Sequence, residues 1–95
     1  MSTVRVEHRA EEHRFVARVE GGEAFLSYQP VDAQTLDLQH TVVPEEDRGE
    51  GVGDALVRAA VDHARAQGQR IVPTCPFVAS WLRAHPEAAS VVASA

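Results

Sequence analysis

The sequence predicts an α+β fold in which a mostly antiparallel, five-stranded sheet packs against one long and one short helix. Apolar and polar residues alternate through the first half of the chain, which is typical of strands with one buried face. The period then changes to that of an amphipathic helix over residues 51–67. Glycines and prolines stand where these elements are expected to end.

The length and composition favour a small independent unit. With 95 residues, of which 44% are hydrophobic, we expect residues 1–95 to form a single domain, because two cores of half this length would each be too small to be stable. Cys75 is the one cysteine, so nothing indicates a disulfide or an oxidising compartment. No segment resembles a signal peptide or approaches the ~20 apolar residues that span a bilayer. We therefore expect a cytoplasmic protein without a membrane partner.

The charge distribution argues against nucleic acid as a partner. Nine basic and fourteen acidic residues give a net charge of −5, and the basic residues are scattered rather than gathered in one stripe. All nine are arginine, so the chain has no lysine that could acetylate itself.

Short alternating segments predict the first strands. Residues 4–7 and residues 14–19 alternate, and Gly21-Gly22 then supplies a hairpin turn. A two-residue loop sets Val19 opposite Ala24 and continues one apolar face into the third strand. That register also sets Glu20 against Glu23, so a longer loop remains an open alternative.

The third strand closes at Pro30, and the fourth ends at Pro44. In the fourth strand, strict alternation places Leu36, Leu38, His40 and Val42 on one face. Because His40 shares this face with Leu36 and Leu38, the ordinary expectation is that it is a hydrogen-bonded core histidine.

The second half of the chain reads as helix, strand and helix. The long helix over residues 51–67 stops at Gly68, and a buried fifth strand follows over residues 69–74. Pro76 opens the short helix, which Pro86 limits. We assign the two aromatic residues of this helix, Phe77 and Trp81, to the core. The tail after it, residues 88–95, is expected to form a last strand or to fray.

No metal site is expected. His63 shares the apolar stripe of the long helix and is interpreted as structural. His8, His13 and His85 show no ligand spacing with one another. The acidic run over residues 45–47 is expected to be a solvated loop.

A glycine-rich loop, Arg48-Gly49-Glu50-Gly51-Val52-Gly53, joins the fourth strand to the long helix. Unpaired backbone N–H groups and the positive end of the helix dipole converge there, and such a place binds anions. Glycines let phosphate oxygens approach the backbone, and Arg48 adds a charge-assisted hydrogen bond. A pyrophosphate fits this description, although a turn that merely starts the helix is an equal alternative from the glycines alone.

Two common phosphate motifs are excluded by particular residues. A Walker loop requires Gly-Lys-Ser/Thr, and the chain has no lysine. A dinucleotide fingerprint requires Gly-x-Gly-x-x-Gly/Ala, but its last position is Asp54 when counted from Gly49 and Leu56 when counted from Gly51.

The loop resembles the pyrophosphate loop of the GNAT acetyltransferases, Gln/Arg-x-x-Gly-x-Gly/Ala, in which Arg48, Gly51 and Gly53 fill the fixed positions. The resemblance extends to a family of very small, single-domain, NATD-like GNAT proteins. It is carried by His-Thr-Val-Val-Pro at residues 40–44, by Cys-Pro-Phe at residues 75–77 and by Leu-Arg-Ala-His-Pro at residues 82–86. The small family usually has glutamate where this chain has Val42, so any orienting role of that carboxylate is missing.

This resemblance implies the three-layer α/β GNAT fold and a site for acetyl-CoA. The strand before the loop splays from the strand after the helix, the pantetheine arm lies in the gap, and the adenine lies largely on the surface. Backbone groups of the splayed strand and the glycine loop would hold the cosubstrate; the residues are Val42, Val43, Arg48, Gly49, Glu50, Gly51, Val52 and Gly53.

The resemblance also places the thioester near the end of the fifth strand, flanked by His40 and Cys75. Acetyl transfer needs a base for the amine, a donor for the developing oxyanion and a proton for the leaving thiolate. His40 suits the base, because an imidazole pKa of about 6.5 lies near neutral pH. Cys75 would protonate the thiolate or, alternatively, accept the acetyl group itself, unless it is an inert core residue.

Two functions follow as alternatives. The first is an N-acetyltransferase that moves acetyl from acetyl-CoA directly to an amine. The second is a catalytically weak coenzyme-binding or scaffold module, which Val42 permits. Longer GNAT enzymes carry helices between the first two strands, where this chain has only about five residues. We therefore expect the acceptor-binding side of the site to be open and the acceptor to be a loosely selected or protein-bound amine. The acidic surface mildly favours a cationic acceptor.

Overall fold

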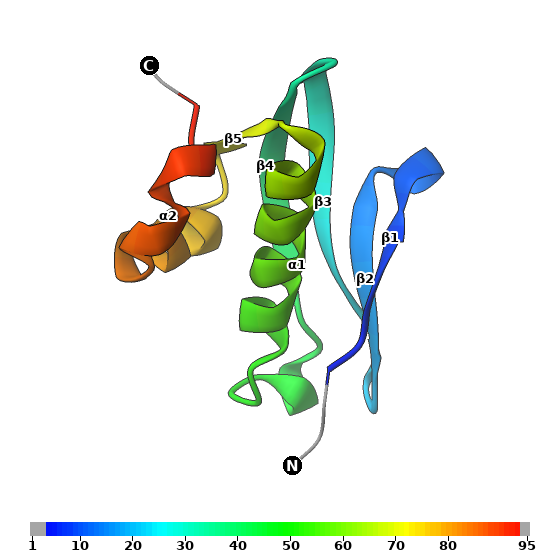
Figure 1. Ribbon diagram of the computed structural model, residues 1–95. Coiled ribbons are helices and arrows are strands. Elements are labelled where there is room, and N and C mark those ends of the chain that lie inside the picture. Colours follow the sequence, from blue (N-terminus) through cyan, green and yellow to red (C-terminus); the bar gives the residue numbers. More distant parts are fainter. Residues whose placement is uncertain (1–3, 94–95) are drawn as a thin grey trace.

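The computed structural model describes residues 4–93, which form one mixed sheet and two α-helices (Figure 1). The sheet order is β1-β2-β3-β4-β5, with every neighbouring pair antiparallel except β4 and β5, which are parallel. The predicted fold class is therefore confirmed. The strands are β1 (Val6–Arg9), β2 (Arg14–Val19), β3 (Gly22–Asp32), β4 (Thr35–Val42) and β5 (Arg70–Pro73); the helices are α1 (Val52–Gln67) and α2 (Pro76–Ala84), with 3₁₀ turns η1 (Ala10–Glu12), η2 (Glu45–Asp47) and η3 (Pro86–Val91).

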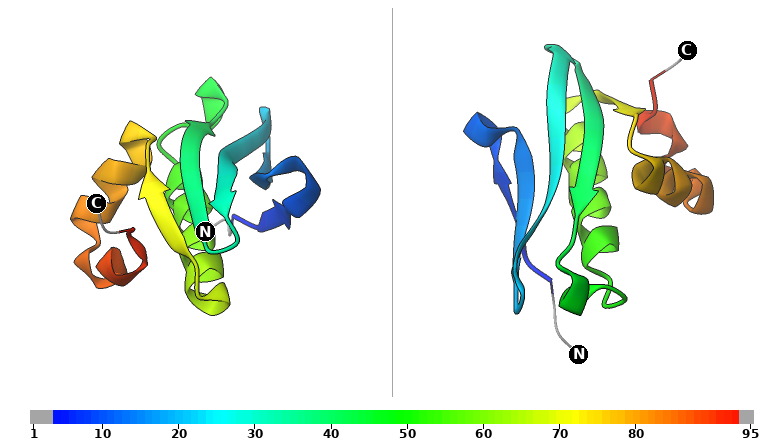
Figure 2. Two further views of the ribbon diagram at one scale, coloured as in Figure 1. Left: turned by 90° about the horizontal axis from the view of Figure 1, so that it is seen from above. Right: turned by 180° about the vertical axis from the view of Figure 1, so that it is seen from behind.

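The helices lie on one side of the sheet. α1 covers one face, and α2 packs beside it at the β5 edge, while the opposite face carries no helix in the described part of the chain (Figure 2). Only the short turn η1 joins β1 to β2, so residues 4–93 carry no α-helix between these two strands. The core between sheet and helices is one cluster, whose largest fully buried side chains are Phe15, Leu26, Leu38, Leu56, Ile71, Val57 and Val78.

The β2–β3 hairpin turns one residue earlier than the glycine pair predicts. Val19 pairs with Gly22 and Ala17 with Ala24, so the two-residue loop is Glu20 and Gly21, and the predicted Val19–Ala24 register was wrong. A shift of two residues keeps every side chain on its predicted face. It also removes the expected repulsion, since Glu23 now lies opposite Arg18 rather than opposite Glu20.

A β-bulge in β4 changes which side chains face the core. Ser27 of β3 pairs with His40, whereas Tyr28 pairs with Leu38, so Gln39 is an extra residue in the ladder. One extra residue reverses the alternation beyond it. His40 and Val42 are consequently exposed, although Leu36 and Leu38 are buried. The prediction that these four residues share one face was wrong.

The helix boundaries agree closely with the sequence. α1 ends at Gly68, which has a left-handed φ of 68°, and Pro76 is the first residue of α2. The tail differs, because residues 86–91 form η3 and bury Ala88 and Val91, and Val92 then bridges to β5. The last two residues of the predicted strand or frayed end lie outside the described range. None of the described helices is long and apolar enough to cross a bilayer.

An aromatic cluster ties β1 to the rest of the sheet and to α1. The His8 ring stacks on Phe15, with centroids 4.3 Å apart and an interplanar angle of 9°. The His63 ring meets His8 edge-on at 4.4 Å, and a hydrogen bond of 2.6 Å joins His8 Nε2 to the Tyr28 hydroxyl. His63 thus has the packing role that its place on the helix stripe predicts.

This cluster makes stability depend on pH. Burial, together with the charge of nearby His63, lowers the pKa of His8 below its ordinary value of 6.5. At His8 the folded state therefore binds fewer protons than the unfolded chain. The contribution of this residue to the free energy of unfolding is fully present above pH 6.5 and is lost as the pH falls towards the folded-state pKa. We expect the melting temperature to fall between pH 7 and pH 5, and to fall less in His8→Phe, which keeps a ring on Phe15. Calorimetric melting across this range tests it, with exposed His40→Gln as the control; equal slopes in all three proteins would contradict it.

Candidate active site

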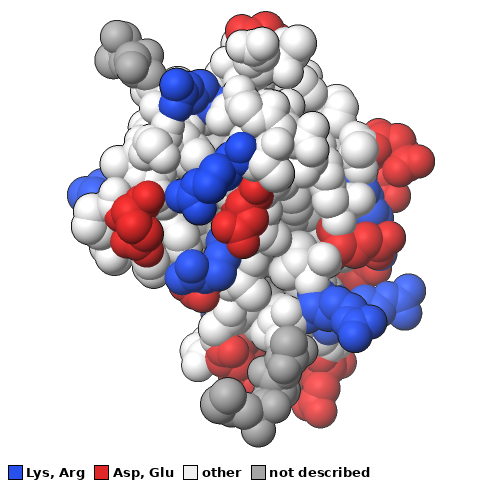
Figure 3. Space-filling model, in the orientation of Figure 1, with Lys and Arg blue, Asp and Glu red and all other residues white. Residues whose placement is uncertain are grey.

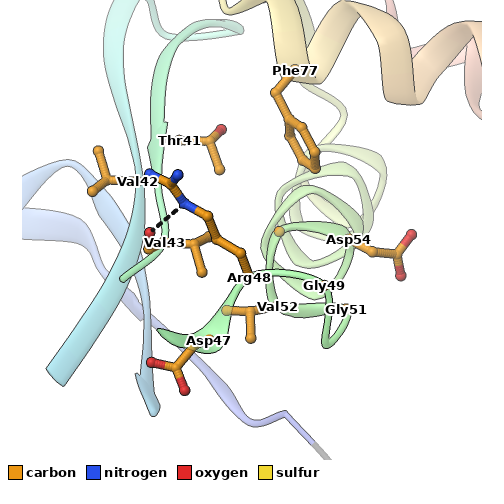
Figure 4. A pocket seen from close by; sticks show the side chains of 11 residues that line it. Thr41, Val42, Val43, Asp47, Arg48, Gly49, Gly51, Val52, Asp54 and Phe77 are labelled. Carbon is orange, nitrogen blue, oxygen red and sulfur yellow. Dashed lines mark hydrogen bonds between the residues drawn. The ribbon is translucent and has the colours of Figure 1, made fainter. Parts of the chain in front are cut away.

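A pocket of about 630 Å³ opens between β4 and the start of α1 (Figure 4). It lies where the parallel strands separate, since their last pair is Leu38 with Pro73 while β4 runs on to Val42. The predicted splay is therefore present, and it leaves one edge of β4 without a strand partner. The pocket is lined by Thr41, Val42, Val43, Asp47, Arg48, Gly49, Gly51, Val52, Gly53, Asp54 and Phe77.

The glycine loop forms the end of the pocket at the start of α1. Gly49 and Gly51 have φ angles of 85° and 83°, a left-handed conformation that favours glycine. Gly51 is the N-cap of α1, and the first backbone N–H groups of any helix have no partner within the helix. Because Gly51, Val52 and Gly53 all line the pocket, these donors and the positive end of the helix dipole lie at its wall.

Arg48 is the one basic residue that lines the pocket among residues 4–93. Its side chain is exposed, and Nε donates to the carbonyl oxygen of Val43 at 3.3 Å (Figure 4). A guanidinium held only by this surface contact is free to turn towards an anion. Glu50, also predicted to contact the cosubstrate, is exposed and does not line the pocket.

Phe77 forms the wall opposite β4, so its assignment to the core was wrong. It is 44% exposed, and its ring lies so close to the helix that a Cβ on Gly53 would approach Phe77 Cζ to 2.7 Å. The buried residues of α2 are Val78, Trp81 and Leu82. Phe77 stands four residues before Trp81, at the edge of the same stripe, so helical spacing alone did not separate it from the core.

Trp81 fixes the two helices beside the pocket. Its indole Nε1 donates to Asp54 Oδ1 at 2.7 Å, which connects α2 to the first turn of α1. The His85 ring stacks on the indole at 3.8 Å. Trp81 is thus structural, as predicted, while the role of Asp54 was not foreseen.

Cys75 lies behind Thr41, at the end of the pocket away from the glycine loop. Its sulfur is buried 3.5 Å from Thr41 Oγ1, and Thr41 itself lines the pocket. Burial acts to raise the pKa of the thiol, but hydrogen bonds from Thr41 and from the backbone of Val78 and Phe77 outweigh it, so the pKa of Cys75 is lowered.

His40 and Cys75 do not meet. The bulge turns His40 to the open face of the sheet, where it is exposed and pairs with Ser27, and it does not line the pocket. Thr41, the next residue, points to the opposite side and contacts Cys75. The two predicted catalytic side chains therefore belong to opposite faces of β4.

Asp47 corrects the prediction of a solvated acidic loop. It is only 4% exposed, and its Oδ2 accepts a hydrogen bond from the backbone N–H of Gly21 at 2.9 Å.

Charged residues are interspersed rather than clustered on the visible face of the molecule (Figure 3). Across residues 4–93 there is no group of three or more His, Cys, Asp or Glu side chains with the geometry of a metal site.

Comparison with known proteins gives consistent matches. The sequence model of a family described as "GCN5-related N-acetyl-transferase" matches residues 14–91. The protein NATD1 of Xenopus tropicalis is 34% identical over 87 residues, which cover 90% of this chain and 80% of that one. The human NATD1 is 33% identical over 85 residues, covering 87% and 75%.

Solved structures agree in fold. The solution structure of a Staphylococcus aureus protein, described as a GCN5-like N-acetyltransferase whose activity is inferred, is similar with a TM-score of 0.76 and 29% identity, covering 100% of this chain and 93% of that one. Ard1 from Thermoplasma volcanium shares the fold alone, with a TM-score of 0.59, 22% identity and coverage of 82% and 58%.

Proposed function

The chain belongs to the family of GCN5-related N-acetyltransferases, and on that premise we propose that it binds acetyl-CoA and transfers the acetyl group directly to an amine. The observation that carries the proposal is the pocket where β4 and β5 separate. It combines a free strand edge, a helix start with unpaired N–H groups and one arginine, which together match an extended amide-containing arm that ends in a pyrophosphate.

The pantetheine arm binds along β4 in this proposal. Beyond Leu38 the edge of β4 that faces the gap has no strand partner, so backbone groups of residues 41–43 are available to the two amides of the arm. Val43 and Phe77 supply apolar surface on either side (Figure 4). The arm then takes the place of an additional short strand.

The pyrophosphate binds at the glycine loop. The N–H groups at the start of α1 donate to its oxygens, and the helix dipole favours its charge. Arg48 leaves the Val43 carbonyl and forms a charge-assisted contact with a phosphate. These residues therefore suit the cosubstrate that the family uses.

The acceptor amine attacks the thioester carbonyl, the carbon–sulfur bond breaks, and coenzyme A leaves as a thiolate. His40 takes the proton of the attacking amine, because it lies on the uncovered face that an acceptor can reach. Cys75, whose lowered pKa makes it the better acid, gives its proton to the thiolate through the Thr41 hydroxyl that separates it from the pocket. A base and an acid on opposite faces of β4 keep the two proton transfers apart.

The acceptor side is open in this proposal. Only η1, of three residues, joins β1 to β2, and no described helix covers that face of the sheet. A site without walls selects its acceptor weakly, so we propose an exposed or protein-bound amine. Release of thiol from acetyl-CoA in the presence of a panel of amines and peptides tests the activity directly. Tight coenzyme binding without turnover on any acceptor would favour the catalytically weak binding module.

Replacing His40 with alanine should reduce kcat/KM for the acceptor at least about tenfold, because a positioned general base typically contributes more than this to the rate. The dissociation constant of acetyl-CoA should not change, because His40 does not line the pocket. Thiol-release kinetics and calorimetric titration measure the two quantities. Unchanged turnover would remove His40 from the mechanism.

Direct transfer predicts that no acetyl group remains on Cys75. Intact-mass spectrometry after mixing the protein with acetyl-CoA, without acceptor, should show an unmodified chain. An adduct of one acetyl group that disappears in Cys75→Ala would instead establish a covalent intermediate on that thiol.

A further inference from the structure

The β2–β3 turn is seated on the segment that leads into the glycine loop. Asp47 is the one buried charged residue within residues 4–93, and its carboxylate accepts a hydrogen bond from the N–H of Gly21, 26 positions away. Asp47 is among the residues that line the pocket, but Figure 4 shows its carboxylate pointing away from the other side chains there. The carboxylate therefore serves the turn and not the pocket.

Gly21 is a glycine because of this contact. It is absent from the residues with positive φ, unlike its neighbour Gly22 at 131°, so its backbone conformation does not require glycine. A Cβ on Gly21 would lie 2.6 Å from Asp47 Oδ2 and 2.8 Å from both Glu46 Cγ and Pro44 Cβ. Only a residue without a side chain lets the turn reach the η2 segment this closely.

The same segment sets the position of the pocket's arginine. Asp47 N donates to Pro44 O at 2.9 Å, and Arg48 N donates to Glu45 O at 3.2 Å, so η2 ends directly at the arginine. The next backbone N–H along the chain with a backbone partner is that of Ala55, which donates to the carbonyl oxygen of Gly51, the N-cap of α1. The conformation of the glycine loop between Arg48 and Gly51 therefore depends on the positions of η2 and of the start of α1. Asp47 fixes the position of η2.

We infer that Asp47 is a positioning residue for coenzyme binding: through the N–H of Gly21, the β2–β3 turn holds Arg48 and the glycine loop in the conformation that receives the phosphates. The effect on affinity rests on the proposed function, whereas the effect on the loop does not. Because the carboxylate acts as a hydrogen-bond acceptor for a backbone N–H, an amide oxygen in the same place can replace it.

Three variants separate positioning from charge. Asp47→Ala should weaken acetyl-CoA binding at least about tenfold in calorimetric titration. This is the effect of losing one hydrogen bond between the misplaced loop and a charged phosphate. Asp47→Asn should stay within about threefold of the parent, because it keeps an acceptor for Gly21. Glu45→Ala removes the same charge from an exposed position of η2 and should leave the affinity unchanged. Equal effects of Asp47→Ala and Asp47→Asn would overturn the inference in favour of an electrostatic role.

Amide hydrogen exchange of the free protein tests the same inference without any ligand. In Asp47→Ala and in Gly21→Ala, protection of the Arg48 amide should fall at least about tenfold, beyond any change at Ala60 in the middle of α1, which reports global opening. Unchanged protection at Arg48 would refute the positioning role whether or not acetyl-CoA binds. Failure of the parent protein to bind acetyl-CoA, with the exchange result as expected, would instead count against the proposed function alone.

Discussion

Replacing Gly51 with alanine is expected to weaken acetyl-CoA binding at least about tenfold, since each lost hydrogen bond to a charged phosphate is worth about 1.5–3 kcal/mol. Gly51 has a φ of 83° at the N-cap of α1, and a Cβ there meets no neighbouring atom, so the strain is purely that of the backbone. A non-glycine residue relieves it by turning the peptide, which moves the N–H groups that line the pocket. Calorimetric titration at a temperature where the variant remains folded measures the loss.

Gly68→Ala is the matched control for this variant. Gly68 ends the same helix with a left-handed φ of 68°, again with open space where a Cβ would stand. Both substitutions should cost about 1–2 kcal/mol of stability through the same backbone strain. Only the change at Gly51 should affect acetyl-CoA affinity, and an equal loss in Gly68→Ala would show that the effect is general destabilisation.

Replacing Arg48 with alanine is expected to weaken acetyl-CoA binding by about tenfold to a hundredfold, the range for losing a charge-assisted hydrogen bond. The Arg48 side chain is exposed and, among residues 4–93, donates only to the Val43 carbonyl, so its removal should leave the fold unchanged. Acetyl-pantetheine, which lacks the pyrophosphate, should bind the parent and the variant equally. Titration of both proteins with both ligands measures the coupling between the side chain and the phosphates.

Arg65→Ala provides the control for net charge. It removes one arginine from the far end of α1, outside the pocket, and changes the overall charge of −5 by the same amount. Its affinity for acetyl-CoA should stay within about twofold of the parent, because exposed charges more than a Debye length apart are largely screened. If acetyl-pantetheine lost as much affinity as acetyl-CoA in Arg48→Ala, the arginine would not act through the phosphates.

The glycine loop and both helices were predictable because their signals are local. Helical spacing from Val52 onward, Gly68 as a left-handed stop and Pro76 as a first helical residue each depend on a few neighbouring positions. The expectation of an anion site followed from these same residues, because a helix start exposes its N–H groups whatever the tertiary context. The pocket lies where that reasoning placed it.

The bulge at Gln39 could not be predicted, because it depends on pairing with β3. Nothing in the alternation of β4 marks an extra residue, yet it moves His40 to the open face and brings Thr41 to Cys75. The hairpin register was decided in a similar way, since the contact of Gly21 with Asp47 involves segments far apart in the chain. Interactions between distant segments, rather than local propensity, determined each of these features.

An NMR titration of the uniformly ¹⁵N-labelled protein with coenzyme A tests the central claim most directly. The account predicts saturable shifts at the amides of Arg48, Gly49, Gly51 and Gly53 and along residues 41–43, with β1 and η3 unaffected. A titration that leaves the glycine-loop amides unchanged, or that shifts only residues away from this pocket, would contradict it.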